Sequence, residues 1–451
     1  MKRDIWLVFL VTTILAGVDV GSAGESAPAI AVESQEYDLA RCIETALSKN
    51  IEILKARERI RREHGAVVEV RAALLPQITA RGAGAQLDKN RLQVLSGDAV
   101  LQETLWMGDV QLRYTLYTGG RGWATWQREK LLHAAAVTEL QAVVNSVMLQ
   151  VHERYYAALL AQAQIRVQEE NGKLLEEELR RAQSLFRAGR ASEFIVLRAE
   201  VALANSRTPL IRARNNLDIA ADELARVLGI PIPPTAKSVV NVRGEMKFTP
   251  AQADLAASLS AAQKNRPELK RLSQLIEAGN QTIRQARSGY APNISTFVGY
   301  GVQSSLFSSN AQNHSNGWSA GVIFLWPLFD GLETHGRITQ AKSELALAKL
   351  AESQGKIDVD LEVRRAHSLL TEATELVKAS QQVVKQAEES LRQASRRFEV
   401  GSATQLDVLD AQLALTQSRT NEIQSLHDYN VARARLAKAI GEPQTSSRAE
   451  K

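Results

Sequence analysis

The sequence predicts a mainly α-helical protein in which duplicated long helical hairpins are joined to a membrane β-barrel. Three observations lead to this fold class. The 451-residue chain is rich in Ala, Leu, Glu, Gln and Arg and only 5% aromatic, a composition that favours long helices. Its two halves repeat one unit. Each half also contains segments in which polar and apolar residues alternate, as they do in strands with one apolar face.

Residues 1–23 have the pattern of a secretory signal peptide. Lys2 and Arg3 precede an apolar run at 5–16, and small residues follow at 21–23, as at a signal-peptide cleavage site. This run is too short to span a bilayer, and no later run reaches the roughly 20 continuous apolar residues of a membrane helix. Strands must therefore carry any membrane-embedded part.

Charge and cysteine content favour a structural role over a chemical one. The net charge is +5 with both signs interleaved, so the basic cluster at 55–62 is better interpreted as a solvated helix face than as a nucleic-acid site. The single cysteine, Cys42, cannot form an intrachain disulfide. Residues 39–42 faintly resemble a lipid-attachment site, but Arg41 and the lack of a preceding apolar run favour a buried, inert thiol.

No motif for catalysis or for a cofactor is found. The seven histidines show no metal-ligand spacing, and a single cysteine excludes thiolate metal sites. No glycine-rich phosphate loop follows a strand. We therefore expect neither an enzyme nor a bound metal or cofactor.

The duplication is clearest where residues 186–231 align with residues 398–443. This gapless alignment has about 17 identities in 46 positions. It predicts a first repeat at 24–229, a linker at 230–250, a second repeat at 251–441 and a tail at 442–451. The expected elements of the first repeat are helices 38–75, 122–187 and 190–228 and strands at about 77–87 and 104–117. Those of the second repeat are helices 254–289, 332–397 and 403–440 and strands at about 293–304 and 318–326.

The helix lengths predict how each repeat packs. The helix at 122–187 would be near 100 Å long at 1.5 Å per residue, whereas 38–75 and 190–228 would each be under 60 Å. Two shorter helices stacked end to end would match one long helix. The sequence therefore predicts a tall hairpin with one leg in two pieces.

The predicted strands favour a membrane over a small soluble sheet. Residues 109–116 alternate strictly, and in 318–326 the apolar face is bounded by Trp318 and Trp326. Nine residues tilted near 40° give roughly 20 Å, close to the lipid-facing band of outer-membrane barrels with aromatic girdles. Four strands cannot close a barrel, and open strand edges are not tolerated in lipid. Three copies of the chain would supply twelve strands.

Several stretches carry a family resemblance: 38–47 with Asn50, 213–218, Leu-Phe-Asp-Gly at 328–331, and 400–401 followed by 407–410. In these residues the chain resembles the TolC family of outer-membrane efflux proteins. The resemblance implies a homotrimer with a twelve-stranded barrel in outer-membrane lipid and a trimeric α-barrel tunnel in the periplasm. It also implies two partners, a periplasmic adaptor (membrane fusion protein) and an inner-membrane efflux pump or secretion transporter, and no nucleic acid.

The resemblance also assigns site residues. The hairpin tips that contact the adaptor in the family match two turns here: Ala188, Gly189, Arg190, Val400, Gly401 and Ser402. Asp407 and Asp410 match an acidic ring in the lumen near the closed end. A second interpretation of Asp407 remains open, because Thr404 lies three residues before it and the pair fits a capping box.

This chain departs from the family at one point. Well-known members hold the closed state partly with an Asp–Arg pair, and the matching positions here are Ile195 and Ala403. With Phe194 and Phe398 beside them, these residues predict an apolar constriction. The alternative to a channel is a soluble periplasmic adaptor or scaffold with helical hairpins, which would lack the girdled strands.

Overall fold

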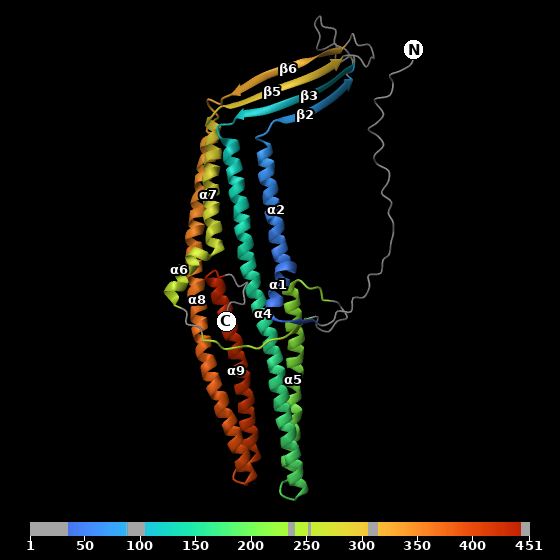
Figure 1. The fold of residues 1–451 in the computed structure, drawn as a ribbon, viewed down its shortest axis with the longest axis vertical. Coiled ribbons are helices and arrows are strands. Elements are labelled where there is room, and N and C mark those ends of the chain that lie inside the picture. The colour runs from blue at the N-terminus through green and yellow to red at the C-terminus, as the bar shows by residue number, and fades with distance from the viewer. Residues whose placement is uncertain are drawn as a thin grey trace, which may run out of the picture.

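The computed structural model describes residues 35–86, 88, 104–232, 240–250, 254–304 and 314–442. The predicted signal peptide lies outside these residues, as does the tail from residue 443. The described chain is elongated, with a sheet at one end and helical hairpins extending away from it (Figure 1).

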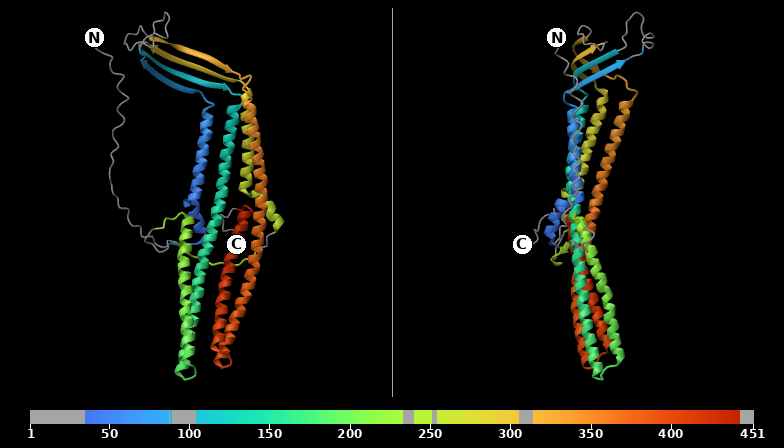
Figure 2. Two further views of the ribbon diagram at one scale, coloured as in Figure 1. Left: turned by 180° about the vertical axis from the view of Figure 1, so that it is seen from behind. Right: turned by 90° about the vertical axis from the view of Figure 1, so that its right-hand side faces the viewer.

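Two long helices run the length of the helical part. The helices α4 (Arg121–Arg187) and α8 (Glu333–Glu399) have 67 residues each. Each turns at its far end into a shorter helix, α5 (Glu193–Leu228) after α4 and α9 (Gln405–Ala439) after α8. The two hairpins hang side by side below the sheet in both views (Figures 1 and 2).

The helices nearer the sheet are broken where the sequence predicted single helices at 38–75 and 254–289. Their segments are α1 (Leu39–Lys49) with α2 (Ile51–Ala72), and α6 (Leu255–Asn265) with α7 (Pro267–Arg287), the latter followed by a short 3₁₀ turn, η1 (Ser288–Tyr290). The Asn50 side chain caps α2 by accepting from the N–H groups of Glu52 and Ile53. Pro267 is the first residue of α7, where its missing N–H costs nothing.

The shorter helices stack along the long ones as predicted. Both α2 and α5 pack on α4, and both α7 and α9 pack on α8 (Figure 1). At the first joint, α5 ends at Gly229, whose positive φ of 74° is the left-handed helix ending. A Cβ added there would lie 2.4 Å from the Lys49 carbonyl oxygen, so only glycine fits between α5 and the α1–α2 break.

The second joint has the same design. The residue after Ile440, Gly441, has a φ of 74°, and its Cβ would lie 3.0 Å from Asn265 backbone carbon. Arg266, between α6 and α7, is only 6% exposed and donates from Nη1 to the Lys438 carbonyl oxygen at 3.1 Å. In both repeats the end of the lower helix therefore abuts the break between two upper helices.

The sheet has four antiparallel strands in the order β2-β3-β5-β6. Their bounds are Gln77–Gln86, Thr104–Tyr117, Asn293–Ser304 and His314–Leu325. The last strand begins four residues earlier than predicted and ends one residue earlier. The edge strands β2 and β6 each have one unpaired side.

A second, two-stranded parallel sheet was not predicted. It pairs β1 (Gln35–Tyr37) with β4 (Val240–Val242), which lies inside the expected linker. The residues that follow β4 are tied to both hairpins: the Tyr155 hydroxyl of α4 donates to the Arg243 carbonyl at 2.9 Å, and the Asn430 amide of α9 donates to the Lys247 carbonyl at 3.2 Å. The linker is therefore a strap across the middle of the molecule.

Two apolar cores lie at this middle level. One joins α1, α4, α5 and the two-stranded sheet, and the other joins α6, α8 and α9. Among the described helices, α4 alone contains a stretch that by length and composition could cross a membrane. Because α2, α5, α7 and α9 all pack on α4, that helix is the central support of the helical part.

Candidate functional site at the hairpin tips

The two tips have the same backbone geometry. Gly189 and Gly401 have φ values of 68° and 78°, in the left-handed region that favours glycine. In each turn the glycine N–H and the next residue's N–H return to carbonyls of the long helix: Arg190 to Leu185 at 2.9 Å, and Ser402 to Arg397 at 2.8 Å. This doubled bonding is the Schellman ending of a helix.

The helices that leave the tips begin differently. Thr404 and Asp407 form a capping box at the start of α9: the Asp407 N–H donates to Thr404 Oγ1 at 3.3 Å, and the Thr404 N–H donates to Asp407 Oδ2 at 2.7 Å. Ser192, the corresponding residue before α5, makes no cap bond with its side chain. The hydrogen bonds from Thr404 hold the pKa of Asp407 below its usual range.

Both candidate ring carboxylates are exposed in the protomer. The structure thus gives Asp407 a capping role, which is compatible with a second role facing a lumen. Asp410 lies one helical turn further along α9 and takes no part in the capping box, so it is the simpler test of the predicted ring.

The predicted constriction residues lie near the tips but do not form one cluster within the protomer. Phe194 is 68% exposed, while Phe398 is partly buried. Among the described residues no ring contact joins them. Ile195 contributes its backbone instead, because its carbonyl accepts a hydrogen bond from Gln405 Nε2 at 3.2 Å. Sequence reasoning missed this link, since a backbone acceptor has no side-chain signature.

Further polar contacts join α4 to α9 above the tips. Gln412, only 3% exposed, donates to the Asn171 carbonyl at 3.5 Å, and the Thr416 hydroxyl lies 3.1 Å from Asn171 Oδ1. Arg419 pairs with Glu170 at 2.6 Å. The lower contact between the hairpins is therefore polar, in contrast to the apolar cores at the middle of the molecule.

The most buried carboxylate of this contact is Glu178 on α4, which is 5% exposed. Its Oε2 lies 3.8 Å from Arg181 Nη1, and Arg181 also lies 3.5 Å from Glu399 at the end of α8. The Gln405 side chain packs against the carboxyl. Burial raises the pKa of Glu178, although Arg181 and Gln405 oppose the shift.

The sheet has a polar and an apolar face, except that Ile323 and Leu325 of β6 are exposed on the polar face. Strand register places Arg81 opposite Asp109, and Thr79 opposite Gln111, on one face. The other face is apolar and open, with Ile78, Val110, Val298, Tyr300, Trp318, Val322 and Phe324 all at least half exposed. Trp326 follows the end of β6, and its indole N–H donates to the Tyr290 carbonyl at 3.1 Å.

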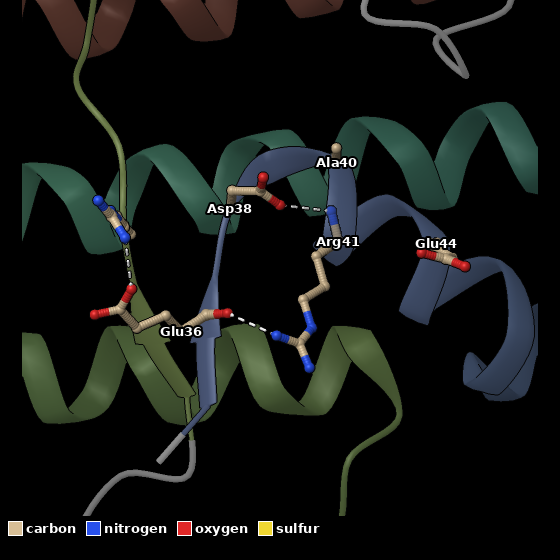
Figure 3. Close-up of a pocket in the computed structure, with 6 residues that line it drawn as sticks. Glu36, Asp38, Ala40, Arg41 and Glu44 are labelled. Atoms are coloured by element: carbon tan, nitrogen blue, oxygen red, sulfur yellow. Dashed lines mark hydrogen bonds and ion pairs between the residues drawn. The ribbon is translucent and has the colours of Figure 1, made fainter.

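An open cavity of about 570 Å³ lies beside the two-stranded sheet (Figure 3). Several of its charged residues have structural contacts: Asp38 caps α1 through the Arg41 N–H at 2.8 Å, and Glu36 pairs with Arg243 of the strap at 3.0 Å. The Arg41 guanidinium also lies 5.2 Å from the centre of the Tyr37 ring. We interpret this cavity as structural.

No metal centre is found in the part of the chain that the structure describes, where no three His, Cys, Asp or Glu side chains are grouped as ligands. The rings of His64 and His133 lie 5.7 Å apart between α2 and α4, a pair that the sequence spacing did not reveal. Cys42 is fully buried, and burial raises the pKa of its thiol to about 12, so it is an inert core residue.

Paired long hairpins with glycine tips, joined to an open-edged sheet with an exposed apolar face, are the features of an outer-membrane channel protein. The family model described as outer membrane efflux protein matches residues 42–230 and 258–442. The chain belongs to this family. It is thus an outer-membrane efflux protein with its helical hairpins in the periplasm, and the proteins of its family are channels.

Individual comparisons agree with this assignment. Nodulation protein T of Rhizobium leguminosarum bv. trifolii is 23% identical over 407 residues, covering 88% of this chain and 84% of that protein. Outer membrane protein TolC of Vibrio cholerae serotype O1 is 24% identical over 381 residues, covering 83% and 84%. The crystal structure of CusC superposes with a TM-score of 0.76 at 20% identity, covering 90% of this chain and 92% of that chain.

Proposed function

We propose that three copies of this chain form one export channel, with a twelve-stranded barrel in the outer membrane and a helical tunnel in the periplasm. The tunnel would receive substrate from an inner-membrane transporter through a periplasmic adaptor. The observation that carries the proposal is the sheet, which has an exposed apolar face and two unpaired edges.

The sheet cannot exist alone in lipid. Each backbone N–H or C=O without a partner costs several kcal/mol in the hydrocarbon region, and β2 and β6 each leave one edge open. Pairing β2 of one copy with β6 of the next supplies the missing hydrogen bonds. Repeating this contact around a ring joins the last copy to the first and closes the sheet into a barrel. The apolar face then meets lipid and the Arg81–Asp109 face lines the lumen.

The helical part supports the same ring. Its two sides, seen at opposite edges in Figures 1 and 2, carry exposed apolar residues that a monomer rarely leaves uncovered. One side is formed by α2 and α5, with Ile51, Leu54, Leu197, Val201, Ile211 and Ile219. The other is formed by α8, with Leu347, Leu350, Ile357, Leu361, Leu376 and Val383. If the α2–α5 side of one copy packs against the α8 side of the next, the contact is head to tail, which is the kind of contact that forms a ring.

Trp318 and Trp326 would form the aromatic girdle at the two lipid interfaces. Trp318 is 77% exposed and Trp326 51%, which suits rings that sit among headgroups. Their separation along the strand matches the height of the lipid-facing band.

The tips would contact the adaptor and close the tunnel. The exposed turns at 188–190 and 400–402 are the part of the protein furthest from the sheet (Figure 1). Asp407 and Asp410 from three copies would form the lumenal acidic ring, and Phe194, Ile195, Phe398 and Ala403 the apolar constriction. An unaltered single-channel current in Phe398→Ala would remove the constriction from the proposal.

Cell fractionation tests the proposal as a whole. A channel should sediment with outer membranes and migrate as an SDS-resistant trimer that dissociates on heating. The rival, a soluble periplasmic adaptor or scaffold, predicts a soluble monomer, and finding one would refute the channel.

A further inference from the structure

The buried polar cluster between the hairpins leaves two acceptor oxygens without a hydrogen-bond donor. Glu178 and Gln405 are each 5% exposed. The Gln405 amide donates to the Ile195 carbonyl and also hydrogen bonds to the Glu178 carboxyl, while Gln405 Oε1 and Glu178 Oε1 are both buried without a hydrogen-bond partner. Leaving a buried acceptor unsatisfied destabilises the packed state, and more so when the acceptor is charged.

A single proton would correct this imbalance. A protonated carboxyl has one O–H donor, which an ionised carboxylate lacks. Protonation would give the partnerless Glu178 oxygen a hydrogen to donate within the cluster, and it would also remove a buried negative charge. The packed arrangement of the hairpins therefore favours the neutral form of Glu178.

We propose that Glu178 is a proton-operated lock between the hairpins: its neutral form holds α4 against α9 near the tips, and its ionisation favours their separation. The inference rests on the proposed channel, because a lock at this place controls passage only if the tips close a tunnel.

The charged surroundings do not replace the proton. Among the residues that the structure describes, only the Arg181 guanidinium of α4 lies within salt-bridge distance of Glu178, and at 3.8 Å it is shared with Glu399 of α8. From α9 the neutral amide of Gln405 hydrogen bonds to the carboxyl and partly opposes the effect of burial, and the nearby Asp407 is bound to Thr404. From α5 the contact is the Ile195 carbonyl, another acceptor. Burial is accordingly the dominant influence and raises the pKa of Glu178 above its ordinary value of 4.5.

The direction of the pH effect follows from linkage. When the hairpins separate, Glu178 becomes solvated and its pKa falls back towards 4.5. The contribution to closure is therefore fully present below that value and is lost as the pH rises through the raised pKa. Acid should close the tunnel, and neutral or alkaline conditions should favour opening.

Single-channel recording of the purified trimer in planar bilayers tests the lock. Between pH 5 and pH 8 the open fraction of the wild type should rise with pH, by at most about tenfold per unit for one titrating group. Glu178→Gln has the shape of the neutral acid, so it should stay mostly closed at every pH. The matched control is Glu177→Gln, which removes the adjacent exposed carboxylate and should keep the wild-type pH response.

A second variant tests the partner. Gln405→Met keeps the side-chain length and removes the hydrogen bond that opposes the raised pKa of Glu178, so the rise of the open fraction should move to a higher pH than in the wild type. A wild-type pH response retained in Glu178→Gln would overturn the lock, as would a wild type whose current does not change with pH. In both cases a conducting trimer would leave the proposed channel standing, whereas the lack of any conducting trimer would overturn both.

Discussion

The two repeats build the same joint with different side chains. In the first, the neutral Asn50 amide donates to the Val227 carbonyl at 2.7 Å and the same side chain caps α2. In the second, the charged Arg266 performs the corresponding contact with Lys438 and is balanced by Glu268 and Glu362. The backbone geometry of the joint is thus common to both copies, while the polar chemistry that satisfies it has diverged.

The same comparison applies nearer the tips. Both turns are closed by a left-handed glycine, but only the second copy has a capping box after it. In the gapless alignment of the two long helices, Glu178 corresponds to Ser390 and Arg181 to Gln393. A buried titratable group between the hairpins is therefore a property of the first copy alone, so each copy has to be tested separately.

The largest effect should come from filling the first joint. Gly229→Ala forces a side chain into the left-handed region, which should cost about 1–2 kcal/mol of stability. Its Cβ would also lie 2.4 Å from the Lys49 carbonyl oxygen, and this overpacking should cost about 1–3 kcal/mol more. Gly189→Ala is the control, because its φ of 68° is similar but nothing lies within 4 Å. Thermal unfolding in detergent, followed by circular dichroism, should show the larger loss for Gly229→Ala; equal losses would contradict the packing argument.

A smaller effect should distinguish the polar partners of the two joints. Arg266→Met leaves Glu268 and Glu362 without their shared cation, which should cost about 2–3 kcal/mol, below the value for fully buried pairs. The reduction follows because both carboxylates are 37% exposed and Glu362 keeps Lys438 at 2.6 Å. Asn50→Ala removes a neutral cap and should cost about 1–2 kcal/mol. The same unfolding assay measures the loss of stability in both variants. A larger loss for Asn50→Ala than for Arg266→Met would show that charge does not set the strength of the joint.

The capping difference should produce a still smaller, local effect. Thr404→Ala should destabilise the start of α9 by about 1 kcal/mol, whereas Ser192→Ala should leave α5 nearly unchanged because Ser192 makes no cap bond. Hydrogen exchange of the first-turn amides reports each helix separately. Because the pKa of Asp407 is lowered, its contribution is present above the usual Asp range and is lost as the pH falls through the lowered value. Protection of α9 that does not decrease at acid pH would argue against the box.

Elements with local signals were predictable from the sequence. The glycine turns, the long helices and the alternating strands all depend on residues close together in the chain. The break at Asn50 had a local signal too, since an asparagine before an amphipathic run is typical of an N-cap, and Pro267 is typical of a first helical position. The helices predicted at 38–75 and 254–289 nevertheless run through Asn50 and Pro267, because the apolar periodicity continues across both positions.

The features that were not predictable depend on tertiary contacts. The strands β1 and β4 are three residues long and pair across about 200 residues of sequence, so neither has a pattern of its own. Glu178 is one of many glutamates on a polar helix, and only the packing of Gln405 on it makes it unusual. The polar link at Ile195 could not be found from side chains, because the acceptor is backbone.

The smallest effect concerns the acidic residues, which the two copies also do not share. In the repeat alignment Asp407 corresponds to Ile195 and Asp410 to Arg198, so the predicted ring would come from the second hairpin only. Asp410→Asn is preferable to a change at Asp407, because it leaves the capping box intact. Removing exposed charges worth a few tenths of a kcal/mol each should lower the cation-over-anion permeability ratio about two- to threefold. Reversal potentials in a salt gradient measure this ratio. Asp218→Asn, which removes the same charge from α5 far from the tips, should not alter it, and an unchanged ratio in Asp410→Asn would exclude Asp410 from the lumenal ring.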